Sequence, residues 1–210
     1  FIQIGGAIGN SIFKKYFDEF GYTQTSGSDI AGEVSSIYYA TENTQFETLE
    51  LAVYSFGQTF KVTPLQHLRA VSTVANGGYL VTPHVLKEMV DDDGNVIYSY
   101  ETEQRVQIFS EETCETLVGI LAEGVATDGG AKNAYVEGYL VAAKTGTSEK
   151  FDILDENGKS YLRIASTVAF APSSEAGIAV IIVVDEPESQ VKYGSVVAAP
   201  YVSALLSEVL

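Results

Sequence analysis

Three apolar segments near the C-terminal end constrain the fold of this 210-residue chain more than any other feature. The first is an apolar run over residues 139–143, at the start of a predicted strand. The second covers residues 161–171, and the third covers residues 177–184. Each has the length of a strand, and the third is a nearly continuous Val and Ile run, typical of a strand buried on both faces. The short connection from Pro172 to Gly177 predicts that the last two strands pair as an antiparallel hairpin.

Helical patterns precede these strands, and another follows them. Thr63-Pro64-Leu65-Gln66 is a capping box with proline at the first helical position, which predicts a helix that extends to Ala75. Its expected core residues are Leu65, Leu68, Val71 and Val74. The other helices are expected over residues 47–56, from the cap at Ser110 through Val125, and over residues 197–210, where Val202, Leu205, Leu206 and Val209 share one side. Helices, then three strands, then a helix predict an α+β fold with helices against an antiparallel sheet.

Residues 1–20 also carry apolar side chains at helical spacing. The expected stripe is Ile4, Ile8, Ile12, Tyr16 and Phe20. Three glycines in the same segment, Gly5, Gly6 and Gly9, weaken the predicted helix. A phosphate-binding loop is a poor interpretation of these glycines, because their spacing is not G-x-G-x-x-G and no βαβ unit surrounds them.

Two acidic segments raise the possibility of a calcium site. Residues 91–95 lie between two strand-like segments, and residues 155–158 form a similar acidic run that ends in glycine. Neither has the glycine and glutamate spacing of a calcium-binding loop, so both are interpreted as turns, the first in a hairpin. His67 and His84 show no ligand spacing with Cys114 or with each other, and no metal or other cofactor is predicted.

Composition indicates one globular domain and excludes some functions. Hydrophobic residues make up 46% of the chain and charged residues 19%, which is typical of a folded domain of this length. The formal net charge of −16 argues against binding to nucleic acid or to anionic membrane surfaces. No apolar run reaches the length of a membrane span. The single cysteine, Cys114, cannot form a disulfide within the chain.

The segment from Lys144 to Thr147 carries the residue types of a reactive site. Lys144 follows an apolar strand-like run, and the Thr145 and Thr147 hydroxyls project from one face of a strand. Gly146 has no side chain, so a ligand or another backbone can approach closely. A cation, two hydroxyl donors and an accessible backbone could bind a carboxylate beside a reacting carbonyl. The alternative interpretation is a lysine at a strand end that is followed by a turn.

Lys144-Thr145-Gly146 resembles one of the three signatures of the serine acyltransferases, which include penicillin-binding proteins and class A β-lactamases. Other segments, in the order expected, resemble the class B penicillin-binding proteins, and most closely their sporulation-specific members. These segments are Gly21–Glu33, with departures at Ser28 and Ala31, Ser55–Gln58, Val62–Gln66, Lys132–Tyr139, Asp185–Pro187 and Ala198–Pro200. The resemblance covers the whole chain.

The resemblance implies the β-lactamase/transpeptidase fold and a D,D-transpeptidase that cross-links peptidoglycan stem peptides through an acyl-serine intermediate. It implies a catalytic role for Lys144, and substrate binding by Thr145, Gly146 and Thr147, with the Thr147 N–H in the oxyanion hole. The implied partners are stem peptides, β-lactam antibiotics and cell-wall synthesis proteins. The implied location is the extracytoplasmic face of a bacterial membrane, with the membrane anchor outside this sequence.

The family's Ser-x-x-Lys and Ser-x-Asn motifs are not found where they should lie. Ser11-Ile12-Phe13-Lys14 has the letters of the first motif but lies downstream of its expected place, and is interpreted as a chance match. Residues 1–210 are therefore expected to be the C-terminal portion of a transpeptidase domain, and to be inactive alone. Two alternatives stay open: a transpeptidase-like module for protein–protein contact, and a serine β-lactamase. A Ser-x-x-Lys motif upstream of Phe1 would exclude the first.

Overall fold

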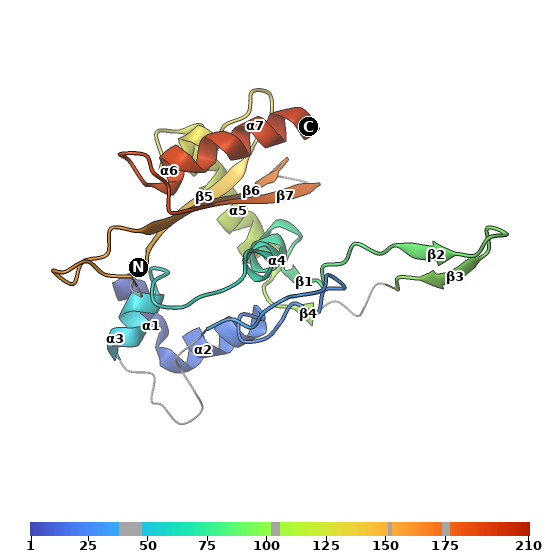
Figure 1. The fold of residues 1–210 in the computed structure, drawn as a ribbon, viewed down its shortest axis with the longest axis horizontal. Helices are drawn as coiled ribbons and strands as arrows, with labels where there is room; N and C mark the ends of the chain where they lie inside the picture. Colours follow the sequence, from blue (N-terminus) through green and yellow to red (C-terminus); the bar gives the residue numbers. More distant parts are fainter. Residues whose placement is uncertain (38–47, 102–105, 151–152, 174–176) are drawn as a thin grey trace.

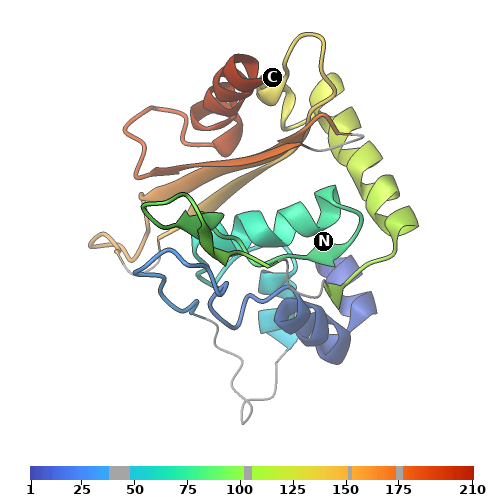
Figure 2. The same cartoon turned by 90° about the vertical axis from the view of Figure 1, so that its right-hand side faces the viewer.

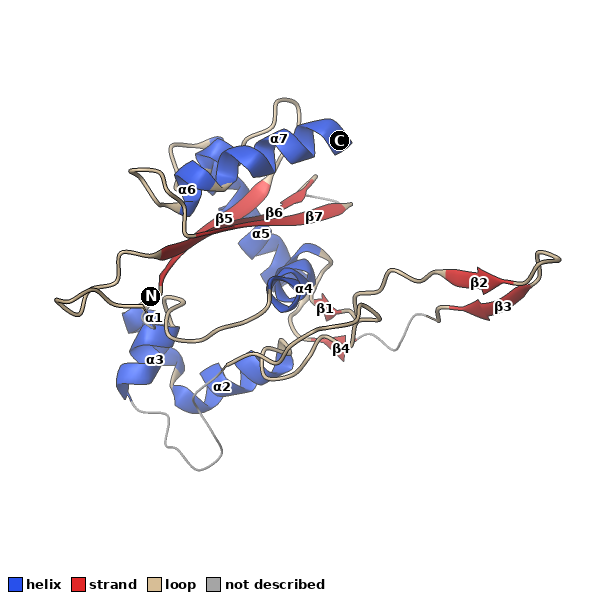
Figure 3. Cartoon of the chain, in the orientation of Figure 1, coloured by secondary structure: helices blue, strands red, loops and turns tan. Residues whose placement is uncertain are grey.

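The computed structural model describes residues 1–37, 48–101, 106–150, 153–173 and 177–210 (Figure 1). Helices and antiparallel strands both occur within these ranges, and most helices precede the main sheet in the chain (Figure 3). The predicted α+β class is therefore confirmed.

The three apolar segments form one antiparallel sheet, as the sequence predicts. β5 (Ala142–Glu149) pairs with β6 (Arg163–Ala171), and β6 pairs with β7 (Ile178–Asp185). β6 is therefore the central strand of the three. β5 begins after residue 139, the predicted start, because the short 3-10 helix η1 (Lys132–Ala134) and a turn precede it.

Helices cover both faces of this sheet (Figure 1, Figure 2). α6 (Gly194–Val197) and α7 (Ala199–Val209) lie on one face, whereas α4 (Pro64–Ala75) and α5 (Glu111–Ala126) lie on the other. None of the helices in the described ranges is long and apolar enough to cross a bilayer. The core between α7 and the sheet includes Ala143, Ala169, Ala171, Val180, Val202 and Leu206.

The buried side of α4 differs from the predicted one. Its buried residues are Gln66, Ala70, Thr73 and Val74, and of these only Val74 was expected in the core. Gln66 tolerates burial because its polar groups are paired. Its Oε1 accepts a hydrogen bond from the Thr63 N–H at 2.9 Å, and its Nε2 donates to the Gln24 carbonyl. The predicted helix boundaries are correct.

β7 and α7 are less buried than their apolar sequences predict. Val180 is the buried residue of β7, so this strand is not covered on both faces within the described part of the chain. β7 is an edge strand of the described sheet, which leaves its outer side without a neighbouring strand. In α7, Val202 and Leu206 are buried as predicted, but Leu205 and Val209 are exposed.

The N-terminal helices form a separate layer below the sheet in Figure 1. Gly9, with φ of 78°, interrupts the predicted helix and divides it into α1 (Ile2–Ile8) and α2 (Asn10–Glu19). α3 (Thr48–Tyr54) is the helix that the sequence predicts over residues 47–56, and it packs against α1. The predicted stripe is not a single buried face, because the break rotates one half against the other. Its exposed members are Ile4, Ile8 and Ile12.

Aromatic side chains join this N-terminal layer to the loop that follows α3. Phe17 on α2 lies against Tyr22, with ring centroids 4.9 Å apart, and meets Phe60 edge-on at 5.2 Å. Phe60 in turn meets Tyr54 of α3 edge-on at 5.7 Å. Such edge-on and offset contacts are the preferred packing of aromatic rings. The loop between α3 and α4 is therefore anchored on both sides.

A hairpin projects from the body of the molecule (Figure 1). β2 (Glu88–Val90) and β3 (Val96–Ser99) pair antiparallel around the acidic turn, as predicted, and all their residues are exposed. A second short pair, β1 (Tyr79–Leu80) with β4 (Val106–Gln107), lies near α4. The Asp29 carboxylate accepts hydrogen bonds from backbone N–H groups at the base of the hairpin, and these bonds lower the pKa of Asp29.

Candidate active site

The outer edge of β5 carries the backbone groups of the candidate site. In an antiparallel pair, residues alternate between those bonded to the partner strand and those whose N–H and C=O face away from it. The Thr145 carbonyl accepts a hydrogen bond from Lys144 Nζ at 2.6 Å, outside the sheet. The Thr147 carbonyl accepts one from Gln58 Nε2 at 3.1 Å. The N–H groups of Thr145 and Thr147 therefore also face this outer edge.

Lys144 presents its ammonium at the same edge. Its side chain leaves the face of β5 opposite to Thr145 and Thr147, because side chains alternate along a strand. The Lys144 side chain is exposed overall, but its ammonium is close enough to the rest of the protein to lose part of its hydration. This partial burial lowers the pKa of Lys144. A lysine with a lowered pKa can exchange a proton with a neighbouring hydroxyl more readily.

The threonine hydroxyls lie on the face of β5 that α6 covers. Thr147 Oγ1 accepts a hydrogen bond from the Gly194 N–H at 3.1 Å. The Thr147 hydroxyl hydrogen is not used in that bond, so it can still donate to a ligand carboxylate. Thr145 Oγ1 lies near Gly130, whose added Cβ would come within 3.9 Å of it. Both hydroxyls are therefore next to small residues.

Two glycines allow this close packing, one predicted as a site residue and one not. A Cβ on Gly146 would lie 2.7 Å from Ser166 Oγ on β6. A Cβ on Gly194 would lie 2.2 Å from the Ser166 carbonyl and 2.4 Å from the Gly146 carbonyl. The Gly194 carbonyl also accepts a hydrogen bond from the buried Thr167 hydroxyl at 3.1 Å. Sequence reasoning missed Gly194 and Thr167, because nothing in their local pattern indicates that they meet β5.

A pocket of about 350 Å³ opens beside Thr147. It lies between the beginning of β6 and the loop that precedes α6. Two basic side chains and two tyrosines give it a mixed cationic and aromatic lining. The lining residues are Thr147, Tyr161, Arg163, Gln190, Val191, Lys192 and Tyr193. Lys144 does not line this pocket, so the outer edge of β5 and the pocket are neighbouring features joined at Thr147.

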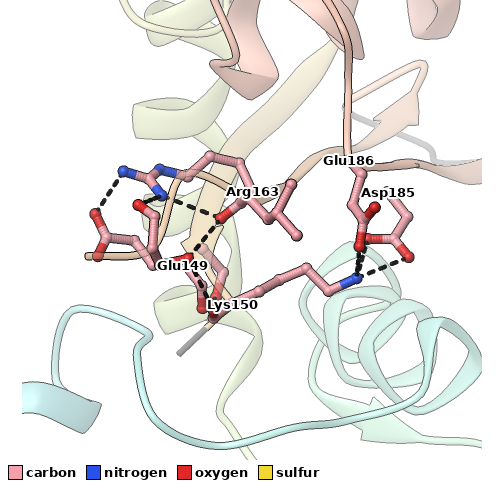
Figure 4. Close-up of polar contacts among 8 residues, drawn as sticks. Glu149, Lys150, Arg163, Asp185 and Glu186 are labelled. Atoms are coloured by element: carbon pink, nitrogen blue, oxygen red, sulfur yellow. Dashed lines mark hydrogen bonds and ion pairs between the residues drawn. The ribbon is translucent and has the colours of Figure 1, made fainter. Parts of the chain in front are cut away.

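Ion pairs fasten the end of β5 to the rest of the sheet (Figure 4). Lys150 Nζ lies 3.0 Å from Asp185 Oδ1 and 2.5 Å from Glu186 Oε1, so it connects the ends of β5 and β7. Lys150 donates hydrogen bonds to the Glu186 and Asp185 carboxylates, and these bonds raise the pKa of Lys150. Arg163 pairs with Glu149 at 2.8 Å. Asp185 and Glu186 belong to a segment noted in the sequence, and the structure places them beside the candidate strand.

The serine, lysine and histidine residues that were also noted in the sequence lie outside the candidate site. Ser11 is exposed on α2, and Lys14 pairs with Asp18 at 2.7 Å, in the layer below the sheet (Figure 1). His67 Nδ1 is hydrogen-bonded to the Tyr22 hydroxyl at 2.8 Å, and His84 stacks on a tyrosine near the hairpin. Among the described residues, no three His, Cys, Asp or Glu side chains gather in a way that could bind a metal ion.

Sequence comparison gives relatives over the full length of the chain. The family model described as "Penicillin binding protein transpeptidase domain" matches residues 1–207. Stage V sporulation protein D of Bacillus subtilis is 36% identical over 100% of this chain and 32% of that protein. Peptidoglycan D,D-transpeptidase FtsI of Escherichia coli K12 is 28% identical over 97% of this chain and 32% of that protein. The chain thus spans about a third of the length of these relatives.

Penicillin-binding proteins are also among the solved structures that this chain resembles. Penicillin-binding protein 3 of Mycobacterium tuberculosis has a TM-score of 0.87 and 21% identity, over 99% of this chain and 48% of that one. The transpeptidase domain of Burkholderia pseudomallei penicillin-binding protein 3 has a TM-score of 0.81 and 24% identity, over 100% and 59%. The mycobacterial protein has also been solved in complexes with aztreonam and ampicillin. These likenesses establish the fold, which is the β-lactamase/transpeptidase-like fold that the sequence predicts.

Proposed function

This chain belongs to the penicillin-binding protein transpeptidase domain family, and from that premise we propose that it forms part of a peptidoglycan D,D-transpeptidase. The observation that carries the proposal is the outer edge of β5. There, backbone N–H groups of Thr145 and Thr147 face outward beside the Lys144 ammonium. Such an edge can pair with an extended peptide, stabilise an oxyanion and provide positive charge within one short strand.

Each residue of the strand has a separate proposed role. The Thr147 N–H donates to the developing oxyanion, as one half of the oxyanion hole. The Thr147 and Thr145 hydroxyls bind the terminal carboxylate of the stem peptide. Gly146 allows the strand to pack against Ser166, which places its neighbours at the edge. Lys144 supplies positive charge and exchanges a proton with the nucleophile, for which its lowered pKa is suited.

The proposed reaction has two steps. A serine of the full-length protein, supplied by residues upstream of Phe1, attacks the D-Ala-D-Ala carbonyl of a stem peptide. The C–N bond to the terminal D-alanine breaks, the serine proton passes to the leaving amine, and an acyl-enzyme remains. The amine of a second stem peptide then attacks the ester carbonyl and forms a new C–N bond. The C–O bond to the serine breaks, the amine proton passes to the serine oxygen, and an amide cross-link remains. A β-lactam would acylate the same serine through its ring carbonyl.

The family of this chain supports a proposal for the cellular setting of the full-length protein. The full-length protein would be anchored in a bacterial membrane by a segment outside this chain, and residues 1–210 would lie on its extracytoplasmic face. Its partners would include other cell-wall synthesis proteins. The identity to a sporulation protein of Bacillus subtilis favours a sporulation role over one in division.

Acylation of the full-length protein by a fluorescent penicillin tests this function. We expect a labelled band after denaturing electrophoresis and a Lys144→Ala variant that is labelled about 10²-fold more slowly or worse, with an unchanged melting temperature. Lys15→Ala, an exposed lysine on α2, is the matched control and should be labelled at the normal rate.

Three outcomes would contradict the proposal. Absence of labelling would favour a transpeptidase-like module without catalysis. Labelling followed by rapid loss of the label, with release of hydrolysed penicillin, would favour a serine β-lactamase. Equal labelling rates in the Lys144→Ala variant and the wild type would remove the role assigned to the candidate strand.

A further inference from the structure

A glutamine far away in the sequence contacts the candidate strand. Gln58 Nε2 donates to the Thr147 carbonyl at 3.1 Å, and the two residues are 89 positions apart. A carbonyl oxygen only accepts, so the NH₂ side of the amide must face Thr147. Gln58 Oε1 is buried without a hydrogen-bond partner in the described part of the chain. Within the described residues, the Gln58 side chain therefore forms its hydrogen bond with β5 alone.

The backbone on both sides of Gln58 is unusual. Gly57 has φ of 83° and Thr59 has φ of 74°. The left-handed region suits glycine but is unfavourable for a β-branched residue such as threonine. Strained residues of this kind persist where the surrounding structure fixes them, and they are enriched at functional sites. The strain at Thr59 thus points to a requirement on the position of its neighbour, Gln58.

The loop that carries Gln58 is fixed at both ends. Before it, the Gln58 N–H donates to the Val53 carbonyl of α3 at 3.3 Å, and the Gly57 N–H donates to the Tyr54 carbonyl at 2.9 Å. After it, Phe60 packs in the aromatic cluster against Tyr54 and Phe17. A side chain on such a loop has little freedom to move, so its bond to β5 sets the position of the strand.

We infer that Gln58 is a positioning residue for the proposed acylation, a role that rests on the proposed function. Its amide fixes the outward-facing backbone of Thr147 and so aligns the Thr147 N–H with the developing oxyanion. The C=O and N–H of one strand residue face the same side, so a bond to the first restricts the direction of the second. Gln58 itself does not touch the reacting atoms.

Two substitutions separate positioning from stability in the full-length protein. Gln58→Met keeps the length of the side chain but removes the amide. Gln58→Glu keeps its shape, and its carboxylate cannot donate to a carbonyl, whereas a protonated carboxyl can. Burial favours the protonated form, so the Glu variant should regain the bond as the pH falls. Gln107→Met, on exposed β4, is the matched control.

The acylation rate constant and the noncovalent dissociation constant for a fluorescent penicillin are measured separately, together with the melting temperature. We expect the acylation rate constant of Gln58→Met to fall about tenfold to a hundredfold, with little change in the dissociation constant. The rate of Gln58→Glu, divided by the wild-type rate at each pH, should rise as the pH falls from about 8 to 5.5. Gln107→Met should match the wild type.

The inference would be overturned by unchanged acylation rate constants, by a pH-independent defect in Gln58→Glu, or by loss of folding in both Gln58 variants. Failure of the proposed function is distinguishable, because it would appear as unlabelled wild type or as a Lys144→Ala variant with a normal rate. A labelled wild type and a slow Lys144→Ala variant, with normal Gln58 variants, would reject the positioning role alone.

Discussion

Gly194 connects α6 with two strands of the sheet: its N–H donates to Thr147 Oγ1 on the candidate strand β5, and its carbonyl accepts from the Thr167 hydroxyl on β6. An added methyl group would meet two backbone carbonyls, which cannot move aside as a flexible side chain can. We expect Gly194→Ala to lower the free energy of unfolding by about 1–3 kcal/mol or more, as in other overpacked sites. Urea denaturation measures this change.

Gly124→Ala is the matched control, because an added Cβ at that helical position meets nothing within 4 Å. There, replacing glycine by alanine within a helix should stabilise the protein by up to about 1 kcal/mol. Equal effects of the two substitutions would mean that the contact of Gly194 with the strands is not close enough to matter.

His67 makes the stability depend on pH. Its ring is bonded to Tyr22, and burial lowers the pKa of His67 below its ordinary value of 6.5. The unfolded chain therefore binds a proton at His67 at a higher pH than the folded protein does. The stability that His67 contributes is present above pH 6.5 and is lost as the pH falls toward its folded pKa.

Urea denaturation between about pH 7.5 and 5 measures this dependence, and a His67→Gln variant should show a shallower loss of stability than the wild type. The variant also changes the bond to Tyr22, so the slope with pH, and not the stability at one pH, is the decisive quantity. A slope equal to that of the wild type would assign the pH dependence to other groups.

The local part of the candidate site could be predicted from the sequence, and its surroundings could not. Lys144, Thr145 and Thr147 are close in sequence, and the period of a strand determines which side chains share a face. Gln58 and Gly194 reach Thr147 from 89 and 47 residues away, through tertiary packing. No pattern within either local segment specifies that contact.

At the scale of elements, Lys150 ties the end of β5 to the end of β7. Lys150→Met removes this connection but keeps the length of the side chain. Ion pairs with exposed partners contribute little to stability, so we expect only a small decrease in the free energy of unfolding. The local effect should be larger, with faster amide hydrogen exchange at the Lys150 and Glu186 N–H groups. These two N–H groups donate hydrogen bonds to backbone carbonyls at the start of β6 or directly before it.

Lys159→Met is a suitable control for this prediction, because Lys159 lies in the turn after β5 and its ammonium is not part of the Lys150 cluster. Unchanged exchange at both N–H groups in the Lys150 variant would show that the backbone pairing of the sheet is sufficient to fix the strand end.

Element boundaries were predicted better than buried faces. α4 has the predicted range because its start depends on a local signal, the capping box, in which Thr63 and Gln66 bond to each other. Its buried side was predicted wrongly, because burial of Gln66 depends on the distant Gln24 carbonyl. The break at Gly9 has a similar origin, since the residues that pack around a glycine in a helical pattern decide whether the helix continues or ends there.

At the scale of the whole molecule, the net negative charge of the protein opposes folding. The formal net charge is −16 at pH 7, with a sequence pI near 4.3. Like charges repel one another more strongly in the compact state, and salt screens that repulsion over a distance of about 10 Å at 0.1 M. We expect the melting temperature to rise when NaCl is increased from about 0.01 to 0.15 M at pH 7.

Differential scanning calorimetry measures this rise, which should shrink as the pH approaches the isoelectric point. A melting temperature that falls with added salt would indicate that attractive ion pairs, such as those of Lys150, outweigh the overall repulsion.

The projecting hairpin offers a place to modify the protein without disturbing the rest of it. Its tip is closed by hydrogen bonds from Gly94 to Asp91 and from Asn95 to Asp91, while both strands of its stem are exposed. Exposed tips of this kind tolerate inserted sequence, because no buried backbone has to move. A peptide tag inserted between Asp92 and Asp93 would therefore allow capture or imaging of the protein, at a distance from the strand on which its chemistry is proposed to depend.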